Sequence, residues 1–541
     1  MMTGIVATVR DVSTMAIAVI LLIVNPVRAA EPLAKASPSS RPNILIILAD
    51  DLGYGDVQCY NSQRGKVPTP NMDRLASEGM RFTDGHCSSG VCSPSRYALL
   101  TGRYHWRTRL QQGIVPVWGG PLIAPDRLTV AGLARQYGYR TGCIGKWHLG
   151  RDWPITQEQR AHFTGFGGKA GGGGEVSTTL TDAHRATWRD VFSRPIPGGP
   201  TARGFDEYFG TDVPNWPPYC FIENDRTVGI PSELLPSEKL VKNQASLQGP
   251  ALQDWQLEAI LPTLRDRATD FIRRQAATKQ PFLLYLPLTS PHTPLAVNKQ
   301  WLGKSGLNLY ADFVMETDAI VGRVLETLRE SGVAENTLVL FTSDNGCAPY
   351  IGVDELESKG HFPSGPLRGY KGAVFEGGHR VPFIVRWPGV VKPGTVCGHL
   401  VHQADLITTL ADIFGKKLPD NSGEDSFSLL PLLKGGDKPV REHAVSCASS
   451  GVPGLRRGPW KVIFERDPKA RTDVQLYNLD DDIGEKTNLA AEKPELVAEM
   501  RALMDRLVTE GRSTPGPRQR NDVEVRRYPV VKAAPKEATL K

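Results

Sequence analysis

The chain has 541 residues, of which 40% are hydrophobic and 23% are charged. These values indicate a globular protein with a sizeable core, and the length is ordinary for a large α/β enzyme with an appended lobe. The formal net charge of +6 does not indicate a nucleic-acid-binding protein, because residues 511–541 alone hold eight Lys or Arg against three acidic residues.

The first thirty residues have the pattern of a signal peptide. Arg10 precedes an apolar run over residues 15–24, and residues 27–29 read Val-Arg-Ala, a small-x-small cleavage pattern. The run is too short to span a bilayer comfortably, and no other segment is long and apolar enough. We therefore predict a signal peptide over 1–30, a linker over 31–41, and a secreted or periplasmic protein without a membrane span. An uncleaved anchor is the alternative.

Four continuous apolar runs predict buried strands. They cover residues 43–49, 282–288, 337–342 and 381–386. Such runs are typical of strands buried on both faces of a parallel sheet. Segments with helical spacing, at 71–79 and 312–330, lie between them. This alternation predicts an α/β fold in which helices sandwich a large mixed or parallel sheet.

Polar side chains follow three of these runs. Asp50 and Asp51 come after the first, His292 after the second, and Asp344 and Asn345 after the third. Sites in open α/β sheets form beyond the carboxyl ends of the strands, so these side chains are expected to share a crevice. Taken alone, the adjacent pair of aspartates would more often belong to a turn or a helix cap.

Two segments resemble the signatures of the sulfatase family. Residues 92–103 read Cys-Ser-Pro-Ser-Arg-Tyr-Ala-Leu-Leu-Thr-Gly-Arg, and residues 138–150 read Gly-Tyr-Arg-Thr-Gly-Cys-Ile-Gly-Lys-Trp-His-Leu-Gly. The resemblance extends from Asn43 to the Leu476-Tyr-Asn-Leu element. In that family the cysteine is oxidised after synthesis to formylglycine, an aldehyde, by a formylglycine-generating enzyme. The resemblance therefore implies a sulfatase whose nucleophile is made from Cys92.

The chemistry explains why such a group suits a sulfate monoester. The ester is anionic and repels an anionic attacker, whereas a hydrated aldehyde offers a neutral gem-diol. One hydroxyl attacks sulfur, and the other then loses its proton and expels sulfate, which splits a difficult step in two. Activating the nucleophile and neutralising the sulfate both call for a hard divalent cation with oxygen ligands.

The resemblance also implies the metal site. Asp50, Asp51, Asp344 and Asn345 match the positions that bind Ca²⁺ in the family, and the group derived from Cys92 is a further ligand. A set rich in histidine and cysteine would have favoured zinc instead.

Roles for the cationic side chains follow from the same resemblance. Arg96 orients and stabilises the nucleophile, and Lys146 and Lys371 hold sulfate oxygens, where preorganised positive charge is most effective. His148 is the candidate base of the second half-reaction, and His292 is the candidate general acid that protonates the leaving oxygen.

One family feature is missing. Related arylsulfatases place a serine near the nucleophile, whereas this chain reads Thr-Asp-Val-Pro-Asn-Trp over residues 211–216, which leaves Asn215 as the candidate for that role. The long stretches 151–203 and 211–250 are predicted as lids or substrate-binding loops, with surface excursions as the alternative.

We divide the chain into a catalytic domain over 42–439, a small C-terminal lobe over 440–510 built on an antiparallel sheet, and a basic, disordered tail over 511–541. Short strands at 460–464 and 474–477 and a closing helix at 495–508 define the lobe.

The predicted substrate is a sulfated sugar or an aryl sulfate ester. A phosphate or phosphonate monoester hydrolase of the same superfamily and a sulfated-glycan-binding pseudoenzyme remain as alternatives. The chain has eight cysteines, so the use of Cys92 in catalysis leaves an odd number, of which at least one must stay free or pair with another chain. The sequence leaves disulfide pairing open.

Overall fold

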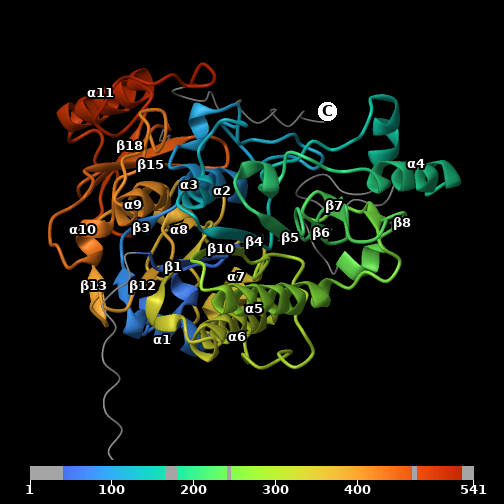
Figure 1. Ribbon diagram of the computed structural model, residues 1–541. Helices are drawn as coiled ribbons and strands as arrows, with labels where there is room; N and C mark the ends of the chain where they lie inside the picture. The colour runs from blue at the N-terminus through green and yellow to red at the C-terminus, as the bar shows by residue number, and fades with distance from the viewer. Residues whose placement is uncertain (1–40, 165–178, 241–244, 466–471, 527–541) are drawn as a thin grey trace, which may run out of the picture. The chain divides into compact units, whose positions relative to one another are not determined.

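A computed structural model describes residues 41–164, 179–240, 245–465 and 472–526. A ten-stranded mixed sheet runs through it in the strand order β13-β2-β12-β11-β1-β10-β4-β5-β6-β7 (Figure 1). Its strands are β1 (Asn43–Ala49), β2 (Met80–Phe82), β4 (Arg140–Ile144), β5 (Glu207–Gly210), β6 (Ile222–Glu223), β7 (Arg226–Thr227), β10 (Phe282–Pro287), β11 (Thr337–Ser343), β12 (Phe383–Arg386) and β13 (Thr395–Cys397). Two short pairs lie beside it: β3 (Gly85–His86) with β14 (Val401–His402), and β8 (Glu233–Leu234) with β9 (Pro250–Ala251).

Strand β1 lies at the centre of this sheet. It pairs in parallel with β10 on one side and β11 on the other, and all seven of its residues are buried. Because side chains alternate between the faces of a strand, Ile44 and Ile46 enter one hydrophobic cluster, whereas Leu45 and Ile47 enter the other. The continuous apolar run therefore reflects a strand that is covered on both faces.

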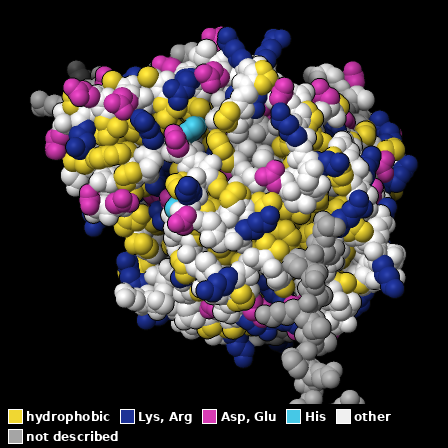
Figure 2. Space-filling model, turned by 60° about the vertical axis from the view of Figure 1, so that its left-hand side comes forward, with side chains coloured by type: hydrophobic (Ala, Val, Ile, Leu, Met, Phe, Trp, Pro, Cys, Tyr) yellow, Lys and Arg dark blue, Asp and Glu magenta, His cyan; other side chains and the backbone are white. Residues whose placement is uncertain are grey.

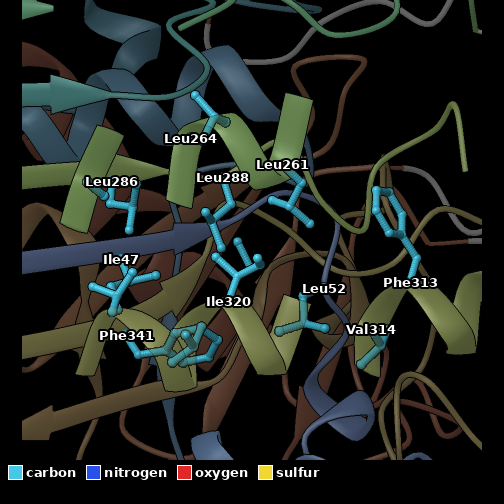
Figure 3. Close-up of a cluster of buried hydrophobic side chains, with 14 of the residues drawn as sticks. Ile47, Leu52, Leu261, Leu264, Leu286, Leu288, Phe313, Val314, Ile320 and Phe341 are labelled. Carbon is cyan, nitrogen blue, oxygen red and sulfur yellow. The ribbon is translucent and has the colours of Figure 1, made fainter. Parts of the chain in front are cut away.

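Helices cover both faces of the sheet. On one face lie α1 (Pro70–Glu78), α5 (Ile260–Thr278) and α6 (Leu309–Glu330); on the other lie α2 (Cys92–Thr101), α3 (Val130–Gln136) and α9 (Leu406–Ile413) (Figure 1). Figure 3 shows Leu261 and Leu264 of α5 and Ile320 of α6 gathered against Ile47 and Leu286 of the sheet. The remaining helices are α4 (Asp182–Ser193), α7 (Val353–Ser358), α8 (Glu376–His379), α10 (Leu430–Leu433) and α11 (Pro494–Glu510). The predicted α/β fold is confirmed.

The last apolar run of the sequence behaves differently from the other three. It forms β12, which pairs antiparallel with β11, so that Phe383 faces Thr342. Because β12 runs in the opposite direction, its carboxyl end lies beside the amino-terminal ends of β1, β10 and β11. This explains why Trp387 and Pro388, rather than polar ligand-type residues, follow that strand.

The C-terminal lobe is a four-stranded antiparallel sheet with α11 packed on it. The strands are β15 (His443–Cys447), β16 (Pro453–Arg457), β17 (Trp460–Ile463) and β18 (Gln475–Asn478), in sequential order. Val462 and Leu476 of the sheet share a buried cluster with Met500 and Leu507 of α11.

The tail is packed where the sequence predicts disorder. Residues 511–526 return to the catalytic domain, where Asp522 pairs with Arg103 at 3.0 Å and Asn521 accepts a hydrogen bond from Arg107 at 3.1 Å. Arg512 is buried and donates to the carbonyl of Thr514 at 2.9 Å. The basic residues of this segment therefore serve in part as packing and pairing groups, which corrects the prediction for residues 511–526. Residues 527–541 lie outside the described residues.

The predicted signal peptide, residues 31–40 of the linker and the Gly-rich stretch 171–174 also lie outside the described residues. Within the described part, no helix combines the length and the apolar character that a membrane crossing requires. Figure 2 shows basic and acidic side chains interspersed over the face that it presents.

Candidate active site

Two neighbouring strands bring the predicted metal ligands together. Asp50 and Asp51 follow β1, and Asp344 and Asn345 follow β11, where Ala49 and Ser343 are register partners. Because the two strands are parallel, their carboxyl ends meet at one edge of the sheet. One carboxylate oxygen from each of the three aspartates lies within 4.8 Å of the others.

This donor set fits a hard cation. All four side chains are buried, and their ligating atoms are carboxylate and amide oxygens, as Ca²⁺ prefers. Asp50 Oδ1 and Asn345 Oδ1 are buried without a hydrogen-bond donor, although buried polar atoms are normally paired. A cation bound between these strand ends would satisfy both oxygens.

The crowding of carboxylates shifts their pKa values in opposite directions. Burial opposes ionisation of Asp50, but Lys146, His292 and Arg96 outweigh it and hold the pKa of Asp50 well below its usual range. Burial, with the nearby charge of Asp50, raises the pKa of Asp344 to about 7. This site therefore favours additional positive charge.

Cys92 is the first residue of α2 and is 2% exposed. Its sulfur lies within 4.8 Å of a carboxylate oxygen of Asp50 and a ring nitrogen of His292. Burial raises the pKa of the Cys92 thiol, against the lowering effect of Lys146. The nucleophile position thus lies directly beside the metal ligands.

Arg96 lies one helical turn after Cys92, so the two side chains project from the same face of α2. Its Nε and Nη2 donate to Asp344 Oδ2 at 3.0 and 2.8 Å, and its Nη1 donates to the backbone carbonyl of Lys146 at 3.0 Å. The four-residue spacing of the motif therefore links the nucleophile helix to the end of β11 and to the segment after β4.

The two predicted sulfate-binding lysines approach from different segments. Lys146 follows β4 and donates to Asp50 Oδ2 at 2.7 Å, and Lys371 donates to Asp51 Oδ2 at 2.7 Å. Gly145 has φ +138°, and a Cβ there would lie 1.8 Å from the carbonyl oxygen of Pro287. Only glycine allows β4 to approach β10 so closely, and this approach delivers Lys146 to the same edge of the sheet as Asp50.

His292 lies in the loop after β10, and that loop is tied to the metal-binding segment. The backbone N–H of Asp50 donates to the carbonyl of Ser290 at 3.0 Å. The Nδ1 of His292 donates to the carbonyl of Thr293, which leaves Nε2 free at 3.6 Å from Asp51 Oδ2. Burial, reinforced by Lys371, lowers the pKa of His292 to about 4.

His148 has the opposite arrangement of its ring nitrogens. Nε2 donates to the carbonyl of Val115 at 3.2 Å, and the buried Nδ1 has no hydrogen-bond partner. Burial, followed by the charges of Lys146 and Arg96, holds the pKa of His148 well below its usual range. The ring is therefore a neutral imidazole with an unpaired lone pair.

Asn215, the candidate in place of the missing serine, is buried, and its Oδ1 has no hydrogen-bond partner. Its amide donates to the carbonyl of Ala245 at 2.6 Å. The next residue, Trp216, packs edge-on against the ring of His148, with the centroids 5.4 Å apart. This aromatic contact with a candidate base was not predicted from the sequence.

Sequence reasoning also missed a second buried ionic group, which we call the interface cluster. It contains Asp84, His86, Glu376, His379, Arg380, Arg456, Lys461 and Glu485. Lys461 Nζ lies 3.0 Å from Glu376 Oε1, 2.8 Å from Glu485 Oε1 and 3.2 Å from His379 Nε2. His86, Glu376 and His379 are close enough to hold a metal, but the side chains of Lys461 and Arg456 already pair with Glu376.

The interface cluster anchors the segment that carries Lys371. The N–H of Lys371 donates to the carbonyl of Cys347 at 2.9 Å, and that of Gly346 donates to Gly378 at 3.0 Å. A Cβ at Gly346 would lie 1.9 Å from the carbonyl oxygen of Gly377, so glycine is required after the metal ligand Asn345. Glu376 and its partners therefore hold a backbone segment that carries Lys371 and contacts the loop that carries Asn345.

Comparison with known proteins agrees with this geometry. The model of the family described as Sulfatase matches residues 42–416. The chain belongs to the sulfatase family. It is therefore an arylsulfatase-like hydrolase of sulfate esters.

Several characterised sulfatases are similar along most of their length. The chain is 32% identical to an N-acetylgalactosamine-6-O-sulfatase of Bacteroides thetaiotaomicron, over 87% of this chain and 94% of the relative. It is 32% identical to human arylsulfatase A, over 88% of each protein.

Solved structures repeat the fold. A Bacteroides thetaiotaomicron sulfatase structure, from work on the metabolism of multiple glycosaminoglycans, superposes with a TM-score of 0.72 at 30% identity, covering 87% of this chain and 99% of the other. Ps i-CgsB in complex with k-i-k-neocarrahexaose gives a TM-score of 0.64 at 26% identity, covering 88% and 94%.

Proposed function

We propose that this sulfatase removes sulfate from a sulfated carbohydrate, with a formylglycine made from Cys92 and with Ca²⁺ held by Asp50, Asp51, Asp344 and Asn345. The observation that carries the proposal is the position of Cys92. Its sulfur lies within 4.8 Å of a carboxylate oxygen of Asp50 and a ring nitrogen of His292, at the start of a helix whose next turn supplies Arg96.

When bound, the cation and the hydrated aldehyde supply a neutralising charge and a nucleophile that can also expel sulfate. The side chains of the protein orient the reacting groups and neutralise the charge of the sulfate. Arg96 fixes Asp344, and Lys146 and Lys371 provide buried positive charge for the sulfate oxygens. Such preorganised charge is most effective in a site from which water is excluded.

The two histidines divide the proton transfers. His292 presents Nε2 to the site. Because its Nδ1–H is held by the carbonyl of Thr293, it gives a proton to the leaving sugar oxygen from Nε2 as the imidazolium form. His148 presents an unpaired Nδ1, which removes the proton of the second hydroxyl in the step that releases sulfate. The hydrogen bond to Val115 fixes the tautomer in which Nδ1 of His148 can accept a proton, and the bond to Thr293 orients the ring of His292.

A carbohydrate substrate is supported by the relatives. Both the 32% identical Bacteroides thetaiotaomicron enzyme and the Ps i-CgsB complex are named for sulfated or oligosaccharide ligands, and each is covered over 94% of its length. An aryl sulfate is then a surrogate substrate with a better leaving group.

The test combines mass spectrometry and sulfate release. The peptide that contains Cys92 is expected to carry an aldehyde when the protein is produced together with a formylglycine-generating enzyme, and the purified enzyme is expected to release sulfate from N-acetylgalactosamine-6-sulfate. Hydrolysis of nitrophenyl phosphate without release of sulfate from any sulfate ester would contradict the proposal and favour the phosphatase alternative. A peptide with unmodified cysteine in an active enzyme would contradict the formylglycine assignment alone.

We also propose that residues 1–30 direct export and are removed. The apolar run between Arg10 and the Val-Arg-Ala pattern supports this. Mass determination of the protein recovered from the medium or periplasm tests it, because an intact Met1 in an exported protein would identify an anchor.

A further inference from the structure

A polar hollow lies where the C-terminal lobe and the tail meet the loop after α2, outside the groups already described. It has a volume of about 250 Å³ and is lined by Arg109, Gln111, Gln112, Ser450, Gly451 and Arg526. Three segments that are distant in sequence meet there: the loop after α2, the turn between β15 and β16, and the end of the packed tail.

Two hydrogen-bonded connections place the hollow next to the catalytic residues. The N–H of Gly113 donates to the carbonyl of Ser449 at 2.7 Å, and the N–H of Ser449 donates to the carbonyl of Gly372 at 2.9 Å, next to Lys371. On the other side, the carbonyl of Val115 accepts the hydrogen bond from His148 at 3.2 Å.

The loop that lines the hollow leads along the chain toward His148. Val115 is three residues from Gln112, so their Cα atoms are at most about 11 Å apart even in an extended chain. The loop that lines the hollow therefore continues directly into the surroundings of His148. A chain of linked sugars whose sulfated unit enters the active site is expected to extend toward the hollow.

The arginines of the hollow differ in their pairing from those nearby. Arg103 and Arg107 lie a few residues earlier and are paired with Asp522 at 3.0 Å and Asp425 at 2.7 Å. No described carboxylate pairs with Arg109 or Arg526. The Nη2 of Arg109 is held by the carbonyls of Gly120 at 2.7 Å and Pro121 at 2.9 Å, which fix the guanidinium without neutralising it.

The tail residue is also held in place through its backbone. The N–H of Arg526 donates to Oε1 of Gln111 at 2.7 Å, and Nε2 of Gln111 donates to the carbonyl of Glu524 at 2.9 Å. This pair of bonds holds the main chain on both sides of residue 525, and Arg526, which is exposed, lines the hollow.

We propose that this hollow is a subsite for a carboxylate or sulfate group on the sugar next to the one that is desulfated. Guanidinium groups bind such oxyanions in pairs of charge-assisted hydrogen bonds, and the two glutamines and Ser450 can bind sugar hydroxyls. The proposal rests on the proposed function, and it narrows the substrate class to an anionic glycan with at least two linked sugars. A substrate that consists of one sulfated sugar cannot occupy this subsite, so it binds the enzyme more weakly.

Three substrates test the subsite on the mature enzyme. They are a disaccharide of sulfated N-acetylgalactosamine linked to a uronic acid, the same disaccharide after reduction of the carboxylate to an alcohol, and sulfated N-acetylgalactosamine alone. The wild type is expected to hydrolyse the uronic acid form with the highest kcat/KM. Arg526→Gln is expected to lower kcat/KM on that form by about tenfold, mainly through KM, because one charged hydrogen-bond partner is lost. It leaves the other two substrates unchanged.

Two further variants serve as controls. Arg526→Lys retains the charge and is expected to retain most of the preference. Arg273→Gln removes another exposed arginine, on α5 and outside the predicted substrate-binding loops, and is expected to change nothing. Equal kcat/KM of the wild type on all three substrates, or an equal loss on all three in Arg526→Gln, would overturn the subsite and leave the sulfatase assignment intact. Failure of the wild type on every sulfated substrate would instead overturn the proposed function.

Discussion

Replacing Lys461 by methionine removes the cation that lies between two buried carboxylates. In the wild type, Lys461 Nζ lies 3.0 Å from Glu376 Oε1 and 2.8 Å from Glu485 Oε1, and all three side chains are almost completely buried. Methionine keeps the length of the side chain but not the charge, so two like charges face each other without water. Removing one partner of a buried ion pair costs about 3–5 kcal/mol in the free energy of unfolding.

The size of the expected change in Tm follows from the size of the protein. With an unfolding entropy of about 2.1 cal/mol/K per residue, a chain of this length unfolds with about 1.1 kcal/mol/K, so Lys461→Met is expected to lower Tm by about 3–5 °C at pH 7. Differential scanning calorimetry measures this. The matched control is Arg457→Met, in the same sheet, which removes an exposed pair with Glu499 at 3.1 Å and is expected to cost less than about 1 kcal/mol.

The pH dependence provides a second test. Burial opposes the charge of Glu376, but Lys461, His86 and Arg456 outweigh it and hold the pKa well below its usual value. A carboxylate whose pKa is depressed in the folded state contributes stability above its unfolded pKa, about 4.3, and this contribution is lost as the pH falls below that value. The difference in Tm between wild type and Lys461→Met is therefore expected to shrink below pH 4. A Tm that is unchanged at pH 7, or a difference that grows at acidic pH, would refute the reasoning.

The remaining predictions concern catalysis. Cys92→Ala is expected to be inactive on every sulfate ester, and turnover near that of the wild type would exclude the proposed nucleophile. Elemental analysis is expected to find about one calcium per chain, with a much lower content in Asp344→Ala; stoichiometric zinc would favour the phosphatase alternative. His292→Ala is expected to lose about 10²–10⁴-fold in kcat/KM on a sulfated sugar but far less on nitrophenyl sulfate, whose leaving group barely needs a proton. Equal losses on both substrates would leave His292 a sulfate-binding residue. His148→Ala is expected to lose sulfate release after a normal burst of alcohol, and loss of the burst itself would contradict its role in the second step.

The parts of the site that the sequence predicts are those encoded next to a strand or within one helical turn. A buried parallel strand can be predicted from its continuous apolar run. Ligand-binding residues in such sheets follow the carboxyl ends of the strands, so Asp50 and Asp344 can be predicted from the sequence alone. The spacing of Cys92 and Arg96 similarly reflects one turn of α2.

The parts that the sequence does not predict depend on long-range docking. Lys461 lies in a short strand whose pattern gives no sign that a lysine there is fully buried, and its partner Glu376 is 85 residues away. The packing of residues 511–526 cannot be predicted for the same reason. A Pro-rich, basic segment is typical of a solvated tail, and only the folded structure shows its contacts with Arg103 and Arg107. The direction of β12 likewise depends on its neighbour in the sheet and not on its own composition.

The contacts between the C-terminal lobe and the segments near Cys92 imply an order of events during biosynthesis. Cys447 bonds to the carbonyl of Ser88 at 3.0 Å, and Ser449 bonds to Gly372, so the lobe braces the segments around Cys92, whose side chain is 2% exposed. The proposed oxidation of this thiol therefore requires access to it before the lobe has been made and docked. The ribosome adds about 5–20 residues per second, so the roughly 350 residues between Cys92 and Cys447 give the modifying enzyme about 20–70 s of access.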